Sequence, residues 1–156
     1  MSSNEKTKTQ QAWEATPDLA VLAIEKQARK FYGEERLDRA QELLEKLVKM
    51  RPEVGPYHAL LGVIHRRQDR WVPALQCLQR AVEIDSSDRN ALVNLGESLV
   101  ICGKVQEGAD LLMTVFEMGY EKGKPPAEQD QLTKRAGAQL AILEKVGKSL
   151  REGNQE

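Results

Sequence analysis

The sequence predicts an all-α fold, a solenoid of repeated helical hairpins. Small residues recur 34 residues apart at Ala28, Gly62 and Gly96, and this spacing is the period of a repeated helix-turn-helix unit. The composition agrees, because only 4% of the residues are aromatic and Gly and Pro are few. No segment shows the alternation of apolar and polar residues that indicates a strand. Three further sets keep the same register: Ala40, Ala74 and Gly108; Leu44, Leu78 and Leu112; and Leu47, Ala81 and Val115.

The length and the net charge of the chain limit the kinds of protein that it can be. A chain of 156 residues suits one domain. Its net charge is only -1, so no overall field draws it to nucleic acid or to an anionic membrane. The N-terminal residues lack the apolar core of a signal peptide, and no run approaches the roughly 18 apolar residues of a spanning helix. We therefore expect a cytoplasmic protein without membrane insertion, in which Cys77 and Cys102 are reduced packing residues.

The N-terminal residues predict a disordered tail over residues 1–15. They are polar, with Trp13 as the exception, and such a composition buries too little apolar surface to fold. A helix start follows. Thr16 supplies a capping hydroxyl and Pro17 occupies the first helical position, where its missing N–H group costs nothing.

Residues 16–120 are expected to form three repeats, over about 21–54, 55–88 and 89–120. Each is a pair of helices whose apolar residues follow the helical period. Pro52 stops the second helix of the first repeat. The turns within the hairpins are expected at Gly33, near Asp69 and at Gly103.

A last helix is expected from about residue 127 to residue 150, within a capping segment over 126–151. Such an amphipathic end helix covers the exposed face of the final repeat of a solenoid. We also expect the third hairpin to be the softest, because Gly108 in a helix interior costs roughly 1 kcal/mol relative to alanine. The apolar side of the last helix is formed by Leu132, Ala136, Leu140, Leu143 and Leu150.

The second copy, YHALLGVIHRRQDRWVPALQCLQRAVEID, carries a family resemblance. A large residue at His58, the pair Leu61-Gly62, His65 and then Ala74 follow the order of a tetratricopeptide repeat. The resemblance covers about residues 21–120. It implies a right-handed α-solenoid of three repeats with a C-terminal capping helix, acting as a protein-binding scaffold.

In such a scaffold the partner binds on the concave surface, which the first helix of each pair lines. The helix positions that point away from the hairpin partner and from the neighbouring repeat give a mixed groove of apolar and polar side chains. The candidates are Glu25, Arg29, Tyr32, Ala59, Val63, Arg66, Arg67, Asn90, Val93, Glu97, Val100 and Ile101. Apolar residues on a face that the core does not need favour binding of a peptide segment.

One binding specialisation of the family can be checked by comparing the residues at five positions. Tetratricopeptide proteins that hold the acidic C-terminus of heat-shock chaperones use Lys and Asn in the first repeat, Asn in the second, and Lys and Arg in the third. The matching positions here are Glu25, Arg29, Leu60, Asn90 and Asn94. This clamp is absent, which argues against a co-chaperone of that kind.

The sequence gives little support for catalysis or for a cofactor. His58 and His65 share a helix face, with Cys77 on the next helix, but both histidines take the places of core aromatic residues and are interpreted as packing residues. No phosphate-binding loop, nucleophile elbow or HExxH motif is present. We predict a non-enzyme with no metal and no cofactor.

A narrower resemblance is to the class II chaperones of bacterial type III secretion systems, which are small cytoplasmic proteins of three tetratricopeptide repeats. The segment GESLVICGKVQEGADLL is similar to their third repeat. The resemblance implies that the groove holds a translocator protein and that the N-terminal region forms a homodimer. A generic adaptor or assembly scaffold stays open, and an RNA-binding or regulatory solenoid that uses Arg66, Arg67 and Arg70 is a more distant alternative.

Overall fold

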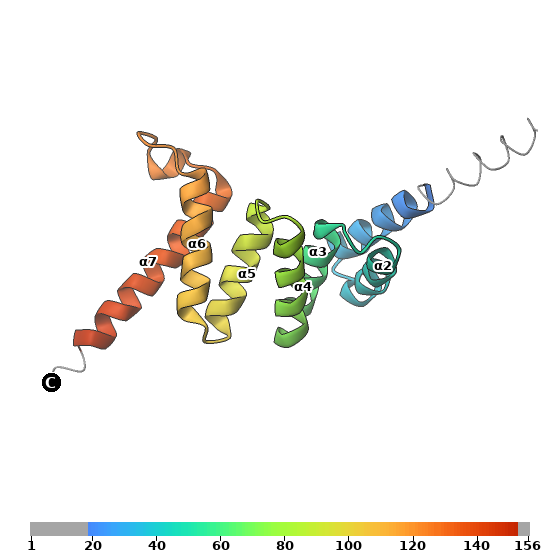
Figure 1. The fold of residues 1–156 in the computed structure, drawn as a ribbon, viewed down its shortest axis with the longest axis horizontal. Coiled ribbons are helices and arrows are strands. Elements are labelled where there is room, and N and C mark those ends of the chain that lie inside the picture. The colour runs from blue at the N-terminus through green and yellow to red at the C-terminus, as the bar shows by residue number, and fades with distance from the viewer. Residues whose placement is uncertain (1–18, 153–156) are drawn as a thin grey trace, which may run out of the picture.

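The computed structural model describes residues 19–152, and in this range the regular structure is helical throughout (Figure 1). The predicted all-α solenoid is confirmed. The predictions for the tail, including Trp13, Thr16 and Pro17, lie outside the described residues. A helical segment, residues 19–33, precedes α2 (Leu37–Met50), α3 (Gly55–Arg67), α4 (Trp71–Ile84), α5 (Arg89–Ile101), α6 (Val105–Gly119), the short 3-10 helix η1 (Pro126–Glu128) and α7 (Gln131–Glu152).

The three turns inside the hairpins share one backbone geometry. Asp69 and Gly103 have φ angles of 57° and 83°, in the left-handed region that glycine adopts most easily. The prediction of a turn at Gly33 is wrong, because Gly33 is still helical. The left-handed residue is Glu35, with φ of 60°, and it stands 34 residues before Asp69.

In the second and third hairpins a glycine lets the two helices approach closely. A Cβ atom placed on Gly62 in α3 would lie 2.5 Å from Leu78 Cγ in α4. A Cβ atom on Gly108 in α6 would lie 2.5 Å from the carbonyl oxygen of Gly96 in α5. The expectation that the third hairpin is the softest stays a prediction, and Gly108 has a packing role besides, because it allows α5 and α6 to pack so closely.

Helix α7 covers the last hairpin, and in Figure 1 its second half extends beyond α6. Ala136 is fully buried, and Leu132 and Leu140 pack against the same cluster as the fully buried Val93. Farther along the helix Leu143 is half-buried. The side chain of Leu150 lies outside the described set.

Both histidines lie on α3 and are buried. His58 Nε2 lies 2.8 Å from the backbone oxygen of Pro52, whereas Nδ1 of His65 has no hydrogen-bond partner within the described residues. Burial and the nearby Arg70 lower the pKa of His65 from its ordinary value, against a smaller opposite effect of Glu45. Among residues 19–152, no three His, Cys, Asp or Glu side chains are grouped as metal ligands.

Between residues 19 and 152, no helix combines the length and the apolar character that crossing a bilayer requires.

We predict that Leu78→Ala costs about 2 to 5 kcal/mol of unfolding free energy, because Leu78 is completely buried between helices. Chemical denaturation measures this cost. Gln79→Ala, one residue along on the exposed side of α4, is the control and should change the free energy little. Equal effects of the two substitutions would contradict the packing described above.

A second prediction concerns the glycines. Gly147→Ala should stabilise α7 by roughly 0.5 to 1 kcal/mol, because the nearest atom to an added Cβ there is Arg151 Nη2 at 4.0 Å. Gly108→Ala should instead destabilise the protein, because the new methyl group meets the backbone of Gly96. A stabilising effect at both positions in thermal unfolding would rule out close packing of α5 on α6.

A third prediction concerns pH. Because the pKa of His65 is lower in the folded protein, the unfolded chain binds a proton more readily below about pH 6.5. Stability should therefore fall as the pH drops from about 6.5 toward the folded pKa of His65. The variants His65→Phe and His65→Gln should each show a smaller loss of melting temperature over this interval. An unchanged pH dependence in both variants would contradict the role of His65.

Candidate functional site

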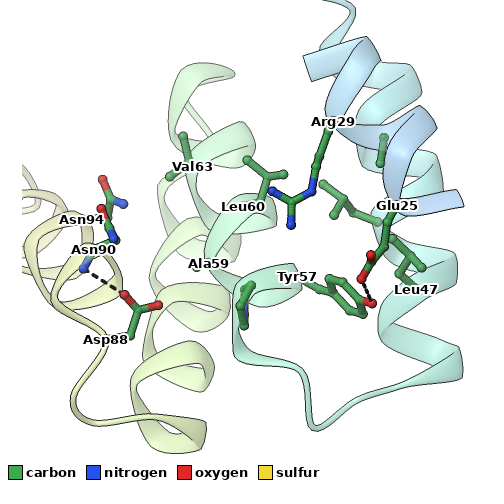
Figure 2. Close-up of a pocket in the computed structure, with 13 residues that line it drawn as sticks. Glu25, Arg29, Leu47, Tyr57, Ala59, Leu60, Val63, Asp88, Asn90 and Asn94 are labelled. Carbon is green, nitrogen blue, oxygen red and sulfur yellow. Dashed lines mark hydrogen bonds between the residues drawn. The ribbon is translucent and has the colours of Figure 1, made fainter. Parts of the chain in front are cut away.

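Side chains of residues 19–33, α2, α3 and α5 line a groove of about 490 Å³ (Figure 2). Helix α3 forms its floor, and residues 19–33 and the start of α5 form its walls. A pocket of this size is typical of ligand sites in proteins. The residues that line it are Glu25, Ala28, Arg29, Leu44, Leu47, Pro56, Tyr57, Ala59, Leu60, Val63, Asp88, Asn90 and Asn94.

The floor of the groove is apolar. Ala59 and Val63 lie one helical turn apart on α3, and both are half-buried. Leu60 stands between them and packs onto the core formed by the first repeat and α3. This core holds the floor in place, while the half-buried side chains keep apolar surface open to solvent.

The wall formed by residues 19–33 carries a carboxylate and a guanidinium group. The buried hydroxyl of Tyr57 donates a hydrogen bond to Glu25. Burial, followed by this bond to Glu25, raises the pKa of Tyr57 to about 12. Arg29 is exposed, and Figure 2 shows its guanidinium group directed toward Leu60.

The wall formed by α5 presents amides. Asp88 caps the helix and accepts hydrogen bonds from the backbone N–H groups of Asn90 at 2.9 Å and Ala91 at 3.3 Å. This cap fixes the first turn of α5. Asn90 and Asn94 then follow one turn apart on the side that faces α3 (Figure 2).

Beside Asn94, toward the C-terminal ends of α3 and α5, salt bridges join Glu97 to Arg66 and Arg135, and this cluster is called the ion bridge below. Glu97 accepts hydrogen bonds from Arg66 Nη1 at 2.9 Å and from Arg135 Nε at 2.6 Å, so α3, α5 and α7 meet at one carboxylate. Its side chain is only 12% exposed. Burial raises the pKa of Glu97, but the hydrogen bonds and charges of Arg135 and Arg66 outweigh this and lower it. Arg135 Nη2 also donates to Asn94 Oδ1 at 3.0 Å.

The structure brings only part of the predicted site together. Five of the twelve predicted residues line the groove: Glu25, Arg29, Ala59, Val63 and Asn90. Arg66 and Glu97 are joined in the ion bridge. Arg67 pairs with Glu35, and its guanidinium carbon lies 5.8 Å from the ring centre of Tyr32. Ile101, at the end of α5, is 60% exposed.

Two predicted residues are not on the groove surface. Val93 is fully buried, because α7 packs over this face of α5. Val100 is partly buried in the third hairpin, where its Cγ2 atom would lie 2.6 Å from a Cβ on Gly108. The assignment of Val93 to the groove surface is therefore wrong, and Val100 packs partly against α6, outside the lining of the groove.

The sequence interpretation of the groove also missed residues. Leu60 and Asn94 line it and were left out, although they stand 34 residues apart in the repeat register. Tyr57 was missed because its role depends on Glu25, 32 residues earlier. Nothing in the sequence near Glu97 indicates Arg135, which is 38 residues away and follows a loop.

Comparison with known proteins establishes the fold. No family model and no curated protein sequence matches the chain. The second TPR domain of human RPAP3, solved with the HSP70 peptide SGPTIEEVD, superposes with a TM-score of 0.67 at 18% identity, over 82% of this chain and 98% of that domain.

Two further solved structures have a similar fold, and one of them is a type III secretion translocator chaperone. The Yersinia enterocolitica translocator chaperone SycD gives a TM-score of 0.72 at 15% identity, over 82% of this chain and 86% of SycD. PcrH from Pseudomonas aeruginosa, solved with the chaperone binding region of PopD, gives 0.72 at 17% identity, over 83% of this chain and 95% of PcrH. The chain therefore has the fold of a tetratricopeptide helical solenoid.

Proposed function

We propose that this chain is a protein-protein interaction module, not an enzyme, and that it binds a peptide segment of a partner in the groove between residues 19–33, α3 and α5. The observation that supports this best is the apolar floor of Ala59, Leu60 and Val63 between two polar walls. Apolar anchors supply most of the affinity in such complexes. Polar groups on the walls bond the partner's backbone and fix its position.

The more specific proposal is a type III secretion chaperone. SycD is a translocator chaperone, and PcrH was solved with the region of PopD that binds it. By analogy, the groove would hold an apolar segment of a secreted translocator in the cytoplasm and keep that protein soluble. Shielding apolar surface from water until secretion is a task for which an open apolar groove is suited.

A generic adaptor or assembly scaffold is the second candidate. Its support is the similarity to RPAP3, whose second TPR domain was solved with an HSP70 peptide. The five positions of the carboxylate clamp do line one groove here, but none of them carries the clamp residue: Glu25, Arg29, Leu60, Asn90 and Asn94 all differ from it in type. An adaptor of this kind would bind another sequence.

RNA binding has weaker support. The three arginines considered for it already have side-chain partners. Arg66 pairs with Glu97, Arg67 with Glu35, and Arg70 donates to Gln41. Phosphate contacts would have to break these interactions.

We predict that Val63→Glu abolishes capture of the partner from the native cytoplasm and lowers the affinity of the purified pair at least tenfold, about 1.4 kcal/mol. A carboxylate on the floor would have to be desolvated under an apolar anchor. Pull-down followed by calorimetric titration measures both effects. Circular dichroism should show unchanged helicity, because Val63 is half-exposed.

The matched control is Val72→Glu, the same substitution at a 68% exposed valine on α4. It should leave capture unchanged. If Val63→Glu binds normally, the groove is not the binding site. If both variants lose the partner, the loss is caused by the added negative charge and does not depend on where on the surface it is placed.

The captured partner decides between chaperone and adaptor. A translocator should aggregate when expressed alone and become soluble when co-expressed with this chain, but not with Val63→Glu. A partner that is folded and soluble by itself would leave the adaptor as the function.

A further inference from the structure

We infer that the pocket between α6 and α7 is a second binding site, which holds an aromatic side chain of a partner peptide in which the neighbouring residue is acidic. The inference does not depend on the groove, because none of the residues that line this pocket lines the groove. The size of the pocket, its aromatic wall, its ordered border and one unpaired cation support it.

The pocket lies where α6 ends and α7 begins, beside the loop that joins the two helices (Figure 1). Its volume is about 310 Å³, which is at the lower end of the range for ligand sites in proteins. A pocket of this volume suits one large side chain. It is too small for a whole structural element of a partner.

Two aromatic rings form one wall of the pocket. Phe116 and Tyr120 are one turn apart at the end of α6, with ring centres 5.1 Å apart and ring planes inclined by 24°. Tyr120 is 49% exposed. A Cβ atom on Gly137 would lie 3.1 Å from Phe116 Cε2, so the glycine lets this ring lie close to α7. Offset stacking and edge contacts with such rings are the geometries that a further aromatic side chain prefers.

Gln129 fixes the loop that borders the pocket. This residue is only 5% exposed. Its side chain donates hydrogen bonds to the backbone oxygens of Glu121 at 2.9 Å and Lys124 at 3.0 Å, and accepts one from the backbone N–H group of Glu121 at 2.9 Å. The loop is therefore ordered without a partner, and binding does not bear the entropy cost of ordering it.

Lys134 is the charged side chain in this lining, and no acidic residue of the described chain lines the pocket with it. The lysine is half-buried, and its ammonium group has no ion pair within residues 19–152. The neighbouring Thr133 hydroxyl is already used, since it donates to Asp130 at 2.5 Å and accepts from Arg89 at 2.8 Å. A partly desolvated ammonium group without a counter-ion favours an anionic ligand. The matching ligand carries a carboxylate beside its aromatic ring.

The rim of the pocket favours a peptide over a free aromatic acid. Pro126 and Ala138 line it and are exposed, so the pocket is open to solvent along this rim. A main chain can run outside the pocket while one side chain enters it. Aromatic residues that enter a pocket in this way supply much of the affinity of protein complexes.

A peptide selection with the groove altered tests the inference. Displayed random dodecapeptides are selected on full-length Val63→Glu and counter-selected on the double variant Val63→Glu/Ala138→Phe, in which a ring fills the pocket. We expect the enriched sequences to share Phe, Tyr or Trp directly beside Asp or Glu, and to be lost on the double variant. No enrichment, or equal binding to the double variant, would overturn the inference. Neither result would affect the proposed function, because the groove variant is the bait in both steps.

One enriched peptide then tests the cation. Lys134→Gln should weaken its binding roughly 3- to 10-fold, whereas Lys145→Gln, the same change at an exposed lysine of α7 outside the pocket, should not. Changing the acidic residue of the peptide to its amide should weaken binding to the wild-type chain and have little further effect on Lys134→Gln. Melting temperatures show that each variant is folded. Additive effects of the two changes would overturn the pairing of Lys134 with the carboxylate.

Phenylacetate separates a peptide from a free aromatic acid, because it has a ring and a carboxylate but no peptide main chain. We expect it to displace the peptide only at a roughly 100-fold higher concentration. Displacement at an equal concentration would overturn the assignment of the pocket to a peptide.

Discussion

The close approach of the two helices in the second and third hairpins is the constraint on which the rest of the structure depends. Gly62 leaves room for Leu78, and Gly96 and Gly108 bring the backbones of α5 and α6 together. Contacts this short transmit any change in side-chain volume directly to the backbone, because protein interiors are packed at crystal-like density. The inner helices keep their spacing as a result, and that spacing is what creates a floor and two walls from residues distant in sequence.

Helix α7 ends the solenoid and also limits its inner surface. It buries Val93, the third-repeat counterpart of Ala59 on the floor, and it supplies Arg135 to the bridge at Glu97. The open groove therefore belongs to the first two repeats and to the near side of α5. A helix expected to act only as a cap consequently determines which part of the concave face is available to a partner.

The sequence predicted the helices well, because small and apolar residues in a 34-residue register report the packing inside a hairpin directly. It predicted the site less well for a physical reason. The 34-residue register gives a residue its place within a repeat, whereas the exposure of its side chain depends on which neighbouring helix packs against it. Val93 has a groove position by register but is covered by α7, and Val100 packs partly against its hairpin partner. The bridging role of Arg135 depends on a loop whose path no local pattern specifies.

The matching left-handed turns at Glu35, Asp69 and Gly103 have an evolutionary consequence. Because the same backbone step recurs at the same place in each unit, no single residue encodes the curvature of the array, which accumulates with the number of units. Duplicating or deleting one unit of the gene would then lengthen or shorten the inner surface by a constant increment. Proteins of this fold could change the length of their inner surface in this way without redesigning the core.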